Sequence, residues 1–451
     1  MKKIFGVFVG AVLVVLAASA APGAAAALES PALSQLRQMN GAQAPAPAPQ
    51  VAPAPVAHDD AQPASRKVTG IGIAHSGNPF DIPNFSPPEI ARMIKDAGGT
   101  HYRPHLPLNE ALPQISAQDM DRLRRAGSDP ALLETMIDEL SRHGRWDRMD
   151  GLVQAFTGSG IKLILVTGCG YKKEAPFYLT SDGALRQVSP DGIGRDVYLT
   201  LMKWLVGAGV RRYAGVVDTW QAENEINVAG ETALLNGWRI KEKSWSDAGF
   251  LQQLVAVIAD TIHQEGRRQG RQLRTTHNFA PAPWDGLVEH SGVAKLIETY
   301  GPSLDIIGID LYENYFLARP FLNKPALADV ADAVRAAGGK PVWVLETGYA
   351  RGPSQRGFSD ANQAAYFQQM FDGAYTDGAD LVLAFGWFWN PLGWYTDQKD
   401  QPLPWWSPMA TEQYWSPLTV SYGPDGAKTV SYGPAWDVFK QAARKWVGGR
   451  P

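Results

Sequence analysis

Short apolar runs alternate with segments of helical period along residues 67–451. The runs are apolar almost throughout, which is typical of strands buried on both faces of a parallel sheet, with helices returning the chain from one strand to the next. Predicted strands are 67–75, 100–106, 161–168, 215–225, 272–280, 304–312, 340–349 and 379–389. Predicted helices are 86–99, 131–156, 197–209, 250–270, 292–301, 326–339, 359–378 and 434–447.

Eight strand-helix units in one domain predict an α/β fold, a (β/α)₈ TIM barrel with enlarged loops after its strands. The alternative is a doubly wound open sheet, which usually carries a glycine-rich phosphate loop after its first strand. Residues 70–77 lack the G-x-G-x-x-G spacing, and the chain has no G-x-x-x-x-G-K-[ST] motif, so the barrel is favoured. The sequence VSYGP at 420–424 and 430–434 flanks Asp425-Gly426, which predicts a local hairpin rather than a repeated domain.

The N-terminus has the three parts of a secretory signal. Lys2 and Lys3 precede an apolar run at 4–16, and Ala18-Ser19-Ala20 follows as a small-residue cleavage site. We therefore expect a signal peptide at 1–20, with an uncleaved anchor as the alternative, and a secreted or periplasmic protein without a membrane span after cleavage. Residues 21–66 are rich in Pro and Ala and predict a linker that is dispensable for folding of the barrel domain at 67–451.

Composition excludes several classes of function. A net charge of −3 gives no basic surface for nucleic acid. The single cysteine, Cys169, excludes an intrachain disulfide and a cysteine-based zinc cluster, and between glycines it is better explained as a small packed thiol than as a nucleophile. His75, His101 and His105 match no fixed ligand spacing. The sequence therefore predicts neither a metal site nor a cofactor.

Catalytic groups of such a barrel lie at the carboxyl ends of the strands. Glu346 follows the apolar run 342–345, where a carboxylate is partly desolvated. Glu223 and Glu225 end another predicted strand, and strand alternation places both on the same side, so geometry does not separate them. Other polar or aromatic residues at predicted strand ends are His75, Arg103, His105, Gln221, Asn224, His277, Asn278, Asp310, Tyr312, Glu313, Trp387 and Trp389. Two carboxylates opposed across a pocket with aromatic walls are what glycoside hydrolysis requires.

These strand ends resemble those of the clan A glycoside hydrolases, which are retaining enzymes on (β/α)₈ barrels. The clan has Asn-Glu after strand 4 and Glu after strand 7, and the phrases WQAENEIN and VWVLETGYA contain Asn224-Glu225 and Glu346. The phrases NEIN, IIGIDLY, ETGYA and ANQAAYFQQMF look most like the endo-galactanase family. Ile226 stands where the clan often has Pro, and THYRPHLP lacks the Arg-x-x-x-Trp phrase of galactanases.

The resemblance implies a role for each matching residue. It makes Glu346 the nucleophile and Glu225, rather than Glu223, the acid/base, with carboxyls about 5–5.5 Å apart. It further implies that Arg103 and Tyr312 bind Glu346, that Asn224 binds the sugar 2-hydroxyl and that Trp387 or Trp389 forms the sugar floor, with His277 as a candidate partner of the acid/base.

We therefore expect a retaining β-glycosidase acting on an oligo- or polysaccharide. The tryptophans at 387–415 favour endo action in an extended cleft, on a neutral or weakly charged β-glycan. Hydrolysis and transglycosylation both remain open. The alternatives are a non-catalytic carbohydrate-binding protein on the same barrel and a tethered structural protein that uses the Pro-rich arm.

Overall fold

The computed structural model describes residues 68–75, 80, 82, 84–168, 176–180, 182–228, 243–280, 292–312, 327–388 and 408–448. The predicted signal peptide, the predicted linker and the domain boundary at residue 67 lie outside these ranges. So do Cys169, Trp389, Trp394, Trp405 and Trp406. Among the described residues, no helix combines the length and the apolar character that crossing a membrane requires.

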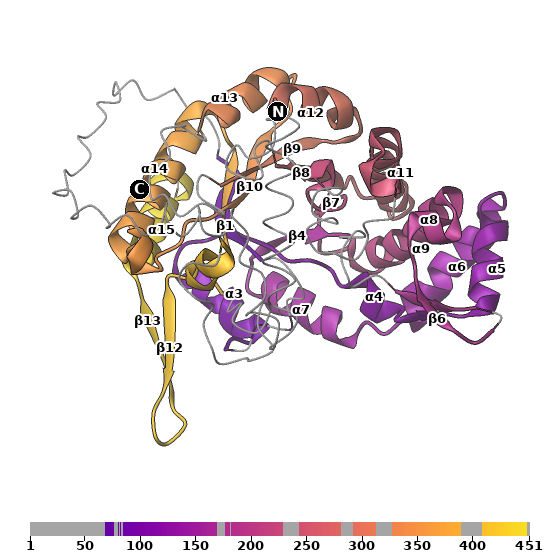
Figure 1. Ribbon diagram of the computed structural model, residues 1–451, viewed down its shortest axis with the longest axis horizontal. Coiled ribbons are helices and arrows are strands. Elements are labelled where there is room, and N and C mark those ends of the chain that lie inside the picture. The colour runs from indigo at the N-terminus through magenta and orange to yellow at the C-terminus, as the bar shows by residue number, and fades with distance from the viewer. Residues whose placement is uncertain are drawn as a thin grey trace, which may run out of the picture. The chain divides into compact units, whose positions relative to one another are not determined.

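Eight parallel strands close into a barrel in the order β1-β11-β10-β9-β8-β7-β4-β2, which confirms the predicted (β/α)₈ architecture (Figure 1). The strands are β1 (Gly70–Ala74), β2 (His101–Arg103), β4 (Lys162–Val166), β7 (Thr219–Gln221), β8 (Arg274–Phe279), β9 (Ile306–Leu311), β10 (Val342–Thr347) and β11 (Leu381–Phe385). Each lies within a predicted strand but is shorter. The largest difference is at 215–225, where only three residues pair as β7.

Helices follow most of the strands and surround the barrel (Figure 1). They are α3 (Pro87–Asp96), α4 (Leu108–Ala111), α5 (Ala117–Ala126), α6 (Pro130–His143), α7 (Asp147–Gly158), α8 (Pro190–Ile193), α9 (Arg195–Tyr213), α11 (Ala248–Arg268), α12 (Val293–Tyr300), α13 (Leu327–Ala336), α14 (Asp360–Asp377) and α15 (Pro434–Ala442). Shorter turns of helix are η1 (Ile226–Val228), η2 (Ser244–Ser246), η3 (Gly301–Ser303), η4 (Ser354–Arg356), η6 (Pro408–Tyr414) and η7 (Ala443–Val447).

The predicted helix 131–156 is wrong in one respect, because the chain breaks there into α6 and α7. Gly144 ends α6 in an extended conformation, and the indole of Trp146 donates to the carbonyl of Leu140 across the break. The apolar period continues through the break because both helices bury one face, so periodicity alone did not reveal it.

Two small sheets lie outside the barrel. One contains β3 (Gln114–Ile115), β5 (Phe177–Leu179) and β6 (Leu185–Gln187). The other is the predicted hairpin, in which β12 (Leu418–Tyr422) pairs antiparallel with β13 (Lys428–Tyr432) and projects from the barrel domain (Figure 1). Gly426 in its turn has φ 77°, a left-handed conformation that glycine adopts without strain.

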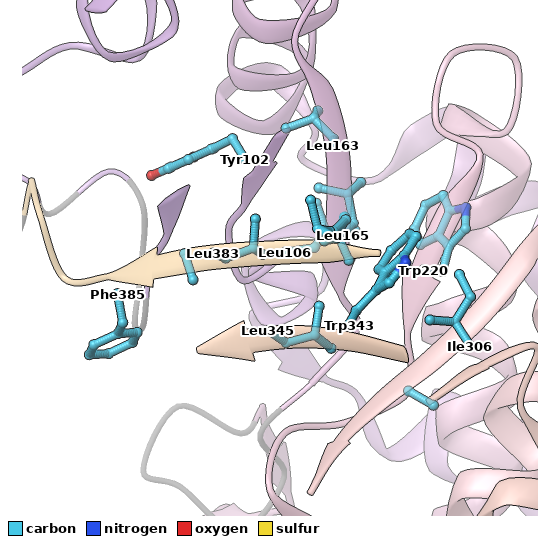
Figure 2. Close-up of a cluster of buried hydrophobic side chains, with 14 of the residues drawn as sticks. Tyr102, Leu106, Leu163, Leu165, Trp220, Ile306, Trp343, Leu345, Leu383 and Phe385 are labelled. Atoms are coloured by element: carbon cyan, nitrogen blue, oxygen red, sulfur yellow. The ribbon is translucent and has the colours of Figure 1, made fainter. Parts of the chain in front are cut away.

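Side chains of β2 alternate between the two faces of the barrel wall. Tyr102 points outward and stacks on Phe156 of α7, with ring centroids 4.3 Å apart. His101 and Arg103 therefore point inward. Figure 2 shows the buried cluster to which Tyr102 and Trp343 belong, with side chains contributed by several barrel strands. Buried polar side chains at or near the carboxyl ends of the strands are His75, Arg103, Gln221, His277, Asn278, Asp310 and Glu346.

Candidate active site

Glu346 lies near the carboxyl end of β10 and is 4% exposed. Both of its oxygens accept hydrogen bonds. Arg103 Nη1 lies 2.7 Å from Oε1, and the hydroxyl of Tyr312 donates to Oε2 over 2.6 Å. Charge-assisted bonds of this kind fix the orientation of a buried carboxylate and offset the cost of removing its charge from water.

A register shift in β10 brings Glu346 to the inside of the barrel. The pairing of β10 with β9 shifts between Val344 and Glu346. The ring of Trp343 meets that of His101, and Glu346 meets Arg103 two residues along the same face of β2. Residues three apart on a regular strand face opposite sides, so the shift is what lets Trp343 and Glu346 share the interior.

Arg103 is fully buried and ties three segments together. Besides its bond to Glu346, its Nε donates to Gln221 Oε1 over 2.6 Å and its Nη2 donates to Asn224 Oδ1 over 2.7 Å. The rigid fork of a guanidinium suits three partners at fixed directions. The predicted pairing of Arg103 with Glu346 is therefore present in the structure.

Tyr312 remains a hydrogen-bond donor. Burial raises the pKa of Tyr312 well above its usual value, and the negative charges of Glu346, Asp310 and Glu225 raise it further. Its ring stacks on Trp415, with centroids 5.5 Å apart, which fixes the direction of the hydroxyl. The structure thus places Tyr312 on Glu346 as the resemblance implies.

The segment after β7 leaves the strand conformation at once. Glu223 has φ 57° and Glu225 has φ 40°, both in the left-handed region that costs a non-glycine residue about 1–3 kcal/mol. The expectation that the two glutamates share one strand face is therefore wrong. Glu223 is fully buried with its carboxyl close to Gly168, whereas Glu225 is half-buried at the mouth.

Asn278 holds this strained segment in place. Its Nδ2 donates to Asn224 Oδ1 over 2.9 Å and to Asp310 Oδ2 over 2.6 Å. Its Oδ1 accepts from Gln221 Nε2 over 2.6 Å and from the backbone N–H of Glu225 over 3.0 Å. Both donors and both lone pairs are thereby used. The sequence indicates that Asn278 lies at a strand end but gives it no role. Because neighbouring residues on a strand face opposite sides, its position next to His277 was the signal that could have identified it as a residue of the site.

His277 contacts the main chain around Glu225. Its Nδ1 lies 2.6 Å from the carbonyl oxygen of Ala222, and its Nε2 accepts from the N–H of Ile226 over 3.4 Å, which fixes the tautomer with the proton on Nδ1. Burial lowers the pKa of His277 to about 4. Its ring packs against Phe279, so the neutral imidazole supports the loop from behind.

Three carboxyl groups converge at the mouth. Glu225, Asp310 and Glu346 each offer one oxygen within 4.8 Å of the others. One oxygen of Glu225 and one of Glu346 are thus no more than 4.8 Å apart, and the separation of about 5–5.5 Å between the two carboxyl groups stays a prediction. Burial raises the pKa of Asp310 well above its usual value, and the charges of Glu346 and Glu225 add to the shift.

The predicted sugar-stacking tryptophans have different positions. Trp387 is fully buried, and its ring packs against Phe367 of α14 and against Trp436 and Phe439 of α15, so the structure gives it a packing role in the helical layer. Trp389, its alternative as the sugar floor, lies outside the described residues.

The three carboxyls are also the one group of His, Cys, Asp and Glu among the described residues that is close enough to hold a metal ion. His75, His101 and His105 form no such group there. Both oxygens of Glu346 already accept from Arg103 and Tyr312. The guanidinium of Arg103 already supplies the positive charge beside Glu346 that a metal cation would otherwise supply. The site is therefore better suited to direct carboxylate chemistry than to metal binding.

No protein-family model matches the chain, and no curated protein matches it in sequence. Solved structures do match. The β-glucosidase of Pyrococcus furiosus is 13% identical, with 80% of this chain and 84% of that chain covered, at a TM-score of 0.54. The β-glycosidase of Thermosphaera aggregans is 12% identical, with 83% and 96% covered, at a TM-score of 0.52. Fpglu1 of Fervidobacterium pennivoraus is 12% identical, with 83% and 95% covered, at a TM-score of 0.53.

The chain shares their fold. This agrees with the fold implied by the resemblance to clan A glycoside hydrolases. At such low identity a shared barrel establishes the fold alone, because (β/α)₈ barrels support many chemistries. What the protein does must therefore be inferred from the side chains at its own barrel mouth.

Proposed function

We propose that the protein is a retaining β-glycosidase that uses Glu346 as nucleophile and Glu225 as acid/base. The observation that carries this proposal is that one oxygen of each carboxyl lies within 4.8 Å of the other, with both Arg103 and Tyr312 hydrogen-bonded to Glu346. The two groups thus have different surroundings, which is what two different roles in one reaction require.

The reaction proceeds in two displacements. Glu346 attacks the anomeric carbon while Glu225 gives its proton to the leaving oxygen, forming a glycosyl ester on Glu346. Glu225 then takes a proton from the incoming water or sugar hydroxyl, and the ester is displaced with a second inversion. Arg103 and Tyr312 hold the oxygens of Glu346 in the direction of attack.

We propose that Asn224 binds the sugar 2-hydroxyl. Its Oδ1 accepts from Arg103 and from Asn278, which fixes the plane of the amide. Its Nδ2 donates to Oε2 of Glu225, the proposed acid/base, over 3.3 Å. A donor fixed in this way can strengthen its bond as the oxocarbenium-like transition state forms.

We further propose that the substrate is a β-linked oligo- or polysaccharide and that the protein is secreted or periplasmic. The signal-like segment at 1–20 supports export. Trp387 and Trp415 are buried, so the proposal of contact with several sugar units and endo action rests on the presence of Trp389, Trp394, Trp405 and Trp406 in the sequence. A neutral or weakly charged glycan suits a chain with a net charge of −3.

The test is turnover of a panel of β-linked polysaccharides, with the anomer of the first product followed by NMR. Release of the β-anomer before mutarotation supports retention, and internal cleavage supports endo action. A 2-deoxy-2-fluoro glycoside should trap the ester on the peptide that contains Glu346, as detected by mass spectrometry. Carbohydrate binding without turnover would favour the non-catalytic alternative, and release of the α-anomer would contradict retention.

A further inference from the structure

The third carboxyl of the cluster has no role in the double displacement. Asp310 lies on β9, is 3% exposed and is paired in register with Glu346 of β10. Its Oδ2 accepts from Asn278, and its Oδ1 is buried without a hydrogen-bond partner among the residues that the structure describes. A buried oxygen in this state is costly if it carries charge.

The charges around Asp310 do not balance if all three acids are ionised. Glu346 faces it from β10, Glu225 from the segment after β7 and Arg103 from β2. The neighbouring donors are neutral, namely the amide of Asn278 on β8 and the hydroxyl of Tyr312 directly after β9. Glu225 carries a proton when it acts as the acid, so an ionised Asp310 would still leave two carboxylates, its own and that of Glu346, facing one guanidinium, and like charges so close together disfavour ionisation of both.

The proton is best placed on Asp310. Glu346 receives two strong donors, from Arg103 and Tyr312, and Glu225 is half-buried at the open end of the cluster. Asp310 receives one neutral donor and is almost fully buried. Burial and its two acidic neighbours act in the same direction, raising the pKa of Asp310 well above its usual value.

Resting on the function proposed above, we propose that Asp310 is a positioning residue that carries a proton in the resting enzyme and, through Asn278, holds the backbone of the acid/base. The chain of contacts runs from Asp310 Oδ2 to Asn278 Nδ2 and from Asn278 Oδ1 to the N–H of Glu225. That N–H belongs to a residue with left-handed φ, which needs external support. A neutral Asp310 gives this support without adding a second negative charge beside Glu346.

The first experiment detects the proton directly. The infrared difference spectrum of the full chain minus Asp310→Asn at neutral pH should contain the carbonyl band of a protonated carboxyl, which shifts in D₂O. The same difference spectrum recorded with Glu225→Gln in place of Asp310→Asn identifies any band that comes from the acid/base. Asp305→Asn is the matched control. Asp305 lies just before β9 and accepts hydrogen bonds from His263 and from the backbone N–H of Thr275. Burial acts to raise the pKa of Asp305, but these hydrogen bonds outweigh it and the pKa is lowered. A spectrum without an Asp310 band would overturn the proposal.

The second experiment tests positioning. Asp310→Ala removes the acceptor of Asn278 and should lower kcat by about 10–100-fold with a smaller change in KM, as loss of a supporting contact does. Asp310→Asn keeps a neutral acceptor of the same shape and should recover most of that loss. An Asp310→Asn variant as impaired as Asp310→Ala would overturn the proposal, since the acid itself would then be required. If Asp310→Ala does not fold, the infrared comparison still decides.

The two proposals fail in different ways. A full chain that turns over no β-glycan contradicts the glycosidase function, while the infrared band still reports whether Asp310 is protonated. An active enzyme that lacks the band contradicts only the role given to Asp310.

Discussion

Two side chains on β2, two residues apart on the same face, have opposite surroundings. His101 meets Trp343 edge-on, with ring centroids 6.2 Å apart, and burial lowers its pKa to about 3, assisted by the charges of Lys162 and Arg274. Arg103, nearer the mouth, keeps its charge and donates to Glu346 and to two amides. The amino end of the barrel interior thus keeps its imidazole neutral through burial and nearby positive charges, whereas the carboxyl end pairs opposite charges.

The difference separates stability from chemistry. At the mouth, Glu223 and Glu225 keep left-handed backbones, and Asp310 keeps an oxygen without a hydrogen bond. Each of these features disfavours folding. The packed layer around Trp343 is fully buried apolar surface whose burial can offset that cost, although among the described residues the indole N–H of Trp343 also has no hydrogen-bond partner. Changes at the mouth should therefore affect turnover most, and changes at the packed end should affect stability most.

The largest expected effect is at the mouth. Glu346→Gln should reduce turnover by about 10⁴-fold or more, because the amide cannot form the glycosyl ester. The amide oxygen can still accept from Arg103, so the variant should remain folded by circular dichroism. Steady-state kinetics on an aryl β-glycoside measure the effect. A variant with a tenth of normal turnover would contradict the nucleophile assignment.

Glu225→Gln should show a loss that depends on the leaving group. Substrates with poor leaving groups should be slowed by about 10²–10⁴-fold, the usual contribution of a general acid, whereas activated aryl glycosides need no acid in the first step. Kinetics on a leaving-group series measure the slope. Glu223→Gln, two residues away and buried near Gly168, is the control and should show no such slope. Equal losses on all substrates would exclude the acid/base role.

Sequence patterns were sufficient to predict the barrel and to predict which residues contact one another at its mouth. The eight strands are present because continuous apolar runs mark strands buried on both faces. Arg103 and Tyr312 do bind Glu346, and Asn224 lies beside Glu225. The catalytic and sugar-binding roles of these residues stay predictions.

What the sequence missed depends on local backbone geometry. Nothing in WQAENEIN marks where β7 ends or that Glu223 and Glu225 turn left-handed, so both were assigned to one strand face. His277 was predicted to assist the acid/base because of the chemistry of its imidazole, and Asn278 was given no role. The contacts of both residues depend instead on which side of β8 each of them faces. Trp387 was predicted to stack on a sugar because composition does not show whether a tryptophan faces the barrel mouth or the helical layer, where Trp387 is buried.

A smaller effect, on stability alone, is expected at the packed end. Trp343→Ala should lower the free energy of unfolding by about 3–5 kcal/mol, because it leaves a cavity beside His101 and Arg274 in a fully buried layer. Chemical denaturation measures this, and turnover per folded molecule should change little. Val216→Ala, at a side chain 57% exposed, is the control and should stay within about 0.5 kcal/mol. A Trp343→Ala protein of normal stability that had lost its activity would contradict the division between the two ends.

An effect of similar size, which both ends share, is a dependence of stability on pH. His101 and His277 have folded pKa values of about 3 and about 4, below the ordinary 6.5, so the unfolded chain takes up protons that the folded protein excludes. Stability should therefore fall as pH falls below 6.5, by about 1.4 kcal/mol per pH unit for each imidazole, until the folded group is itself protonated. Denaturation at pH 7 and pH 5 measures the loss. His101→Asn and His277→Asn should each reduce this pH dependence, but only His277→Asn should also lower turnover, because His277 contacts the backbone on both sides of Glu225, whereas His101 contacts the ring of Trp343 and the hydroxyl of Thr100. Equal effects of the two substitutions on turnover would show that the ends of the barrel are not separated in the way that their contacts indicate.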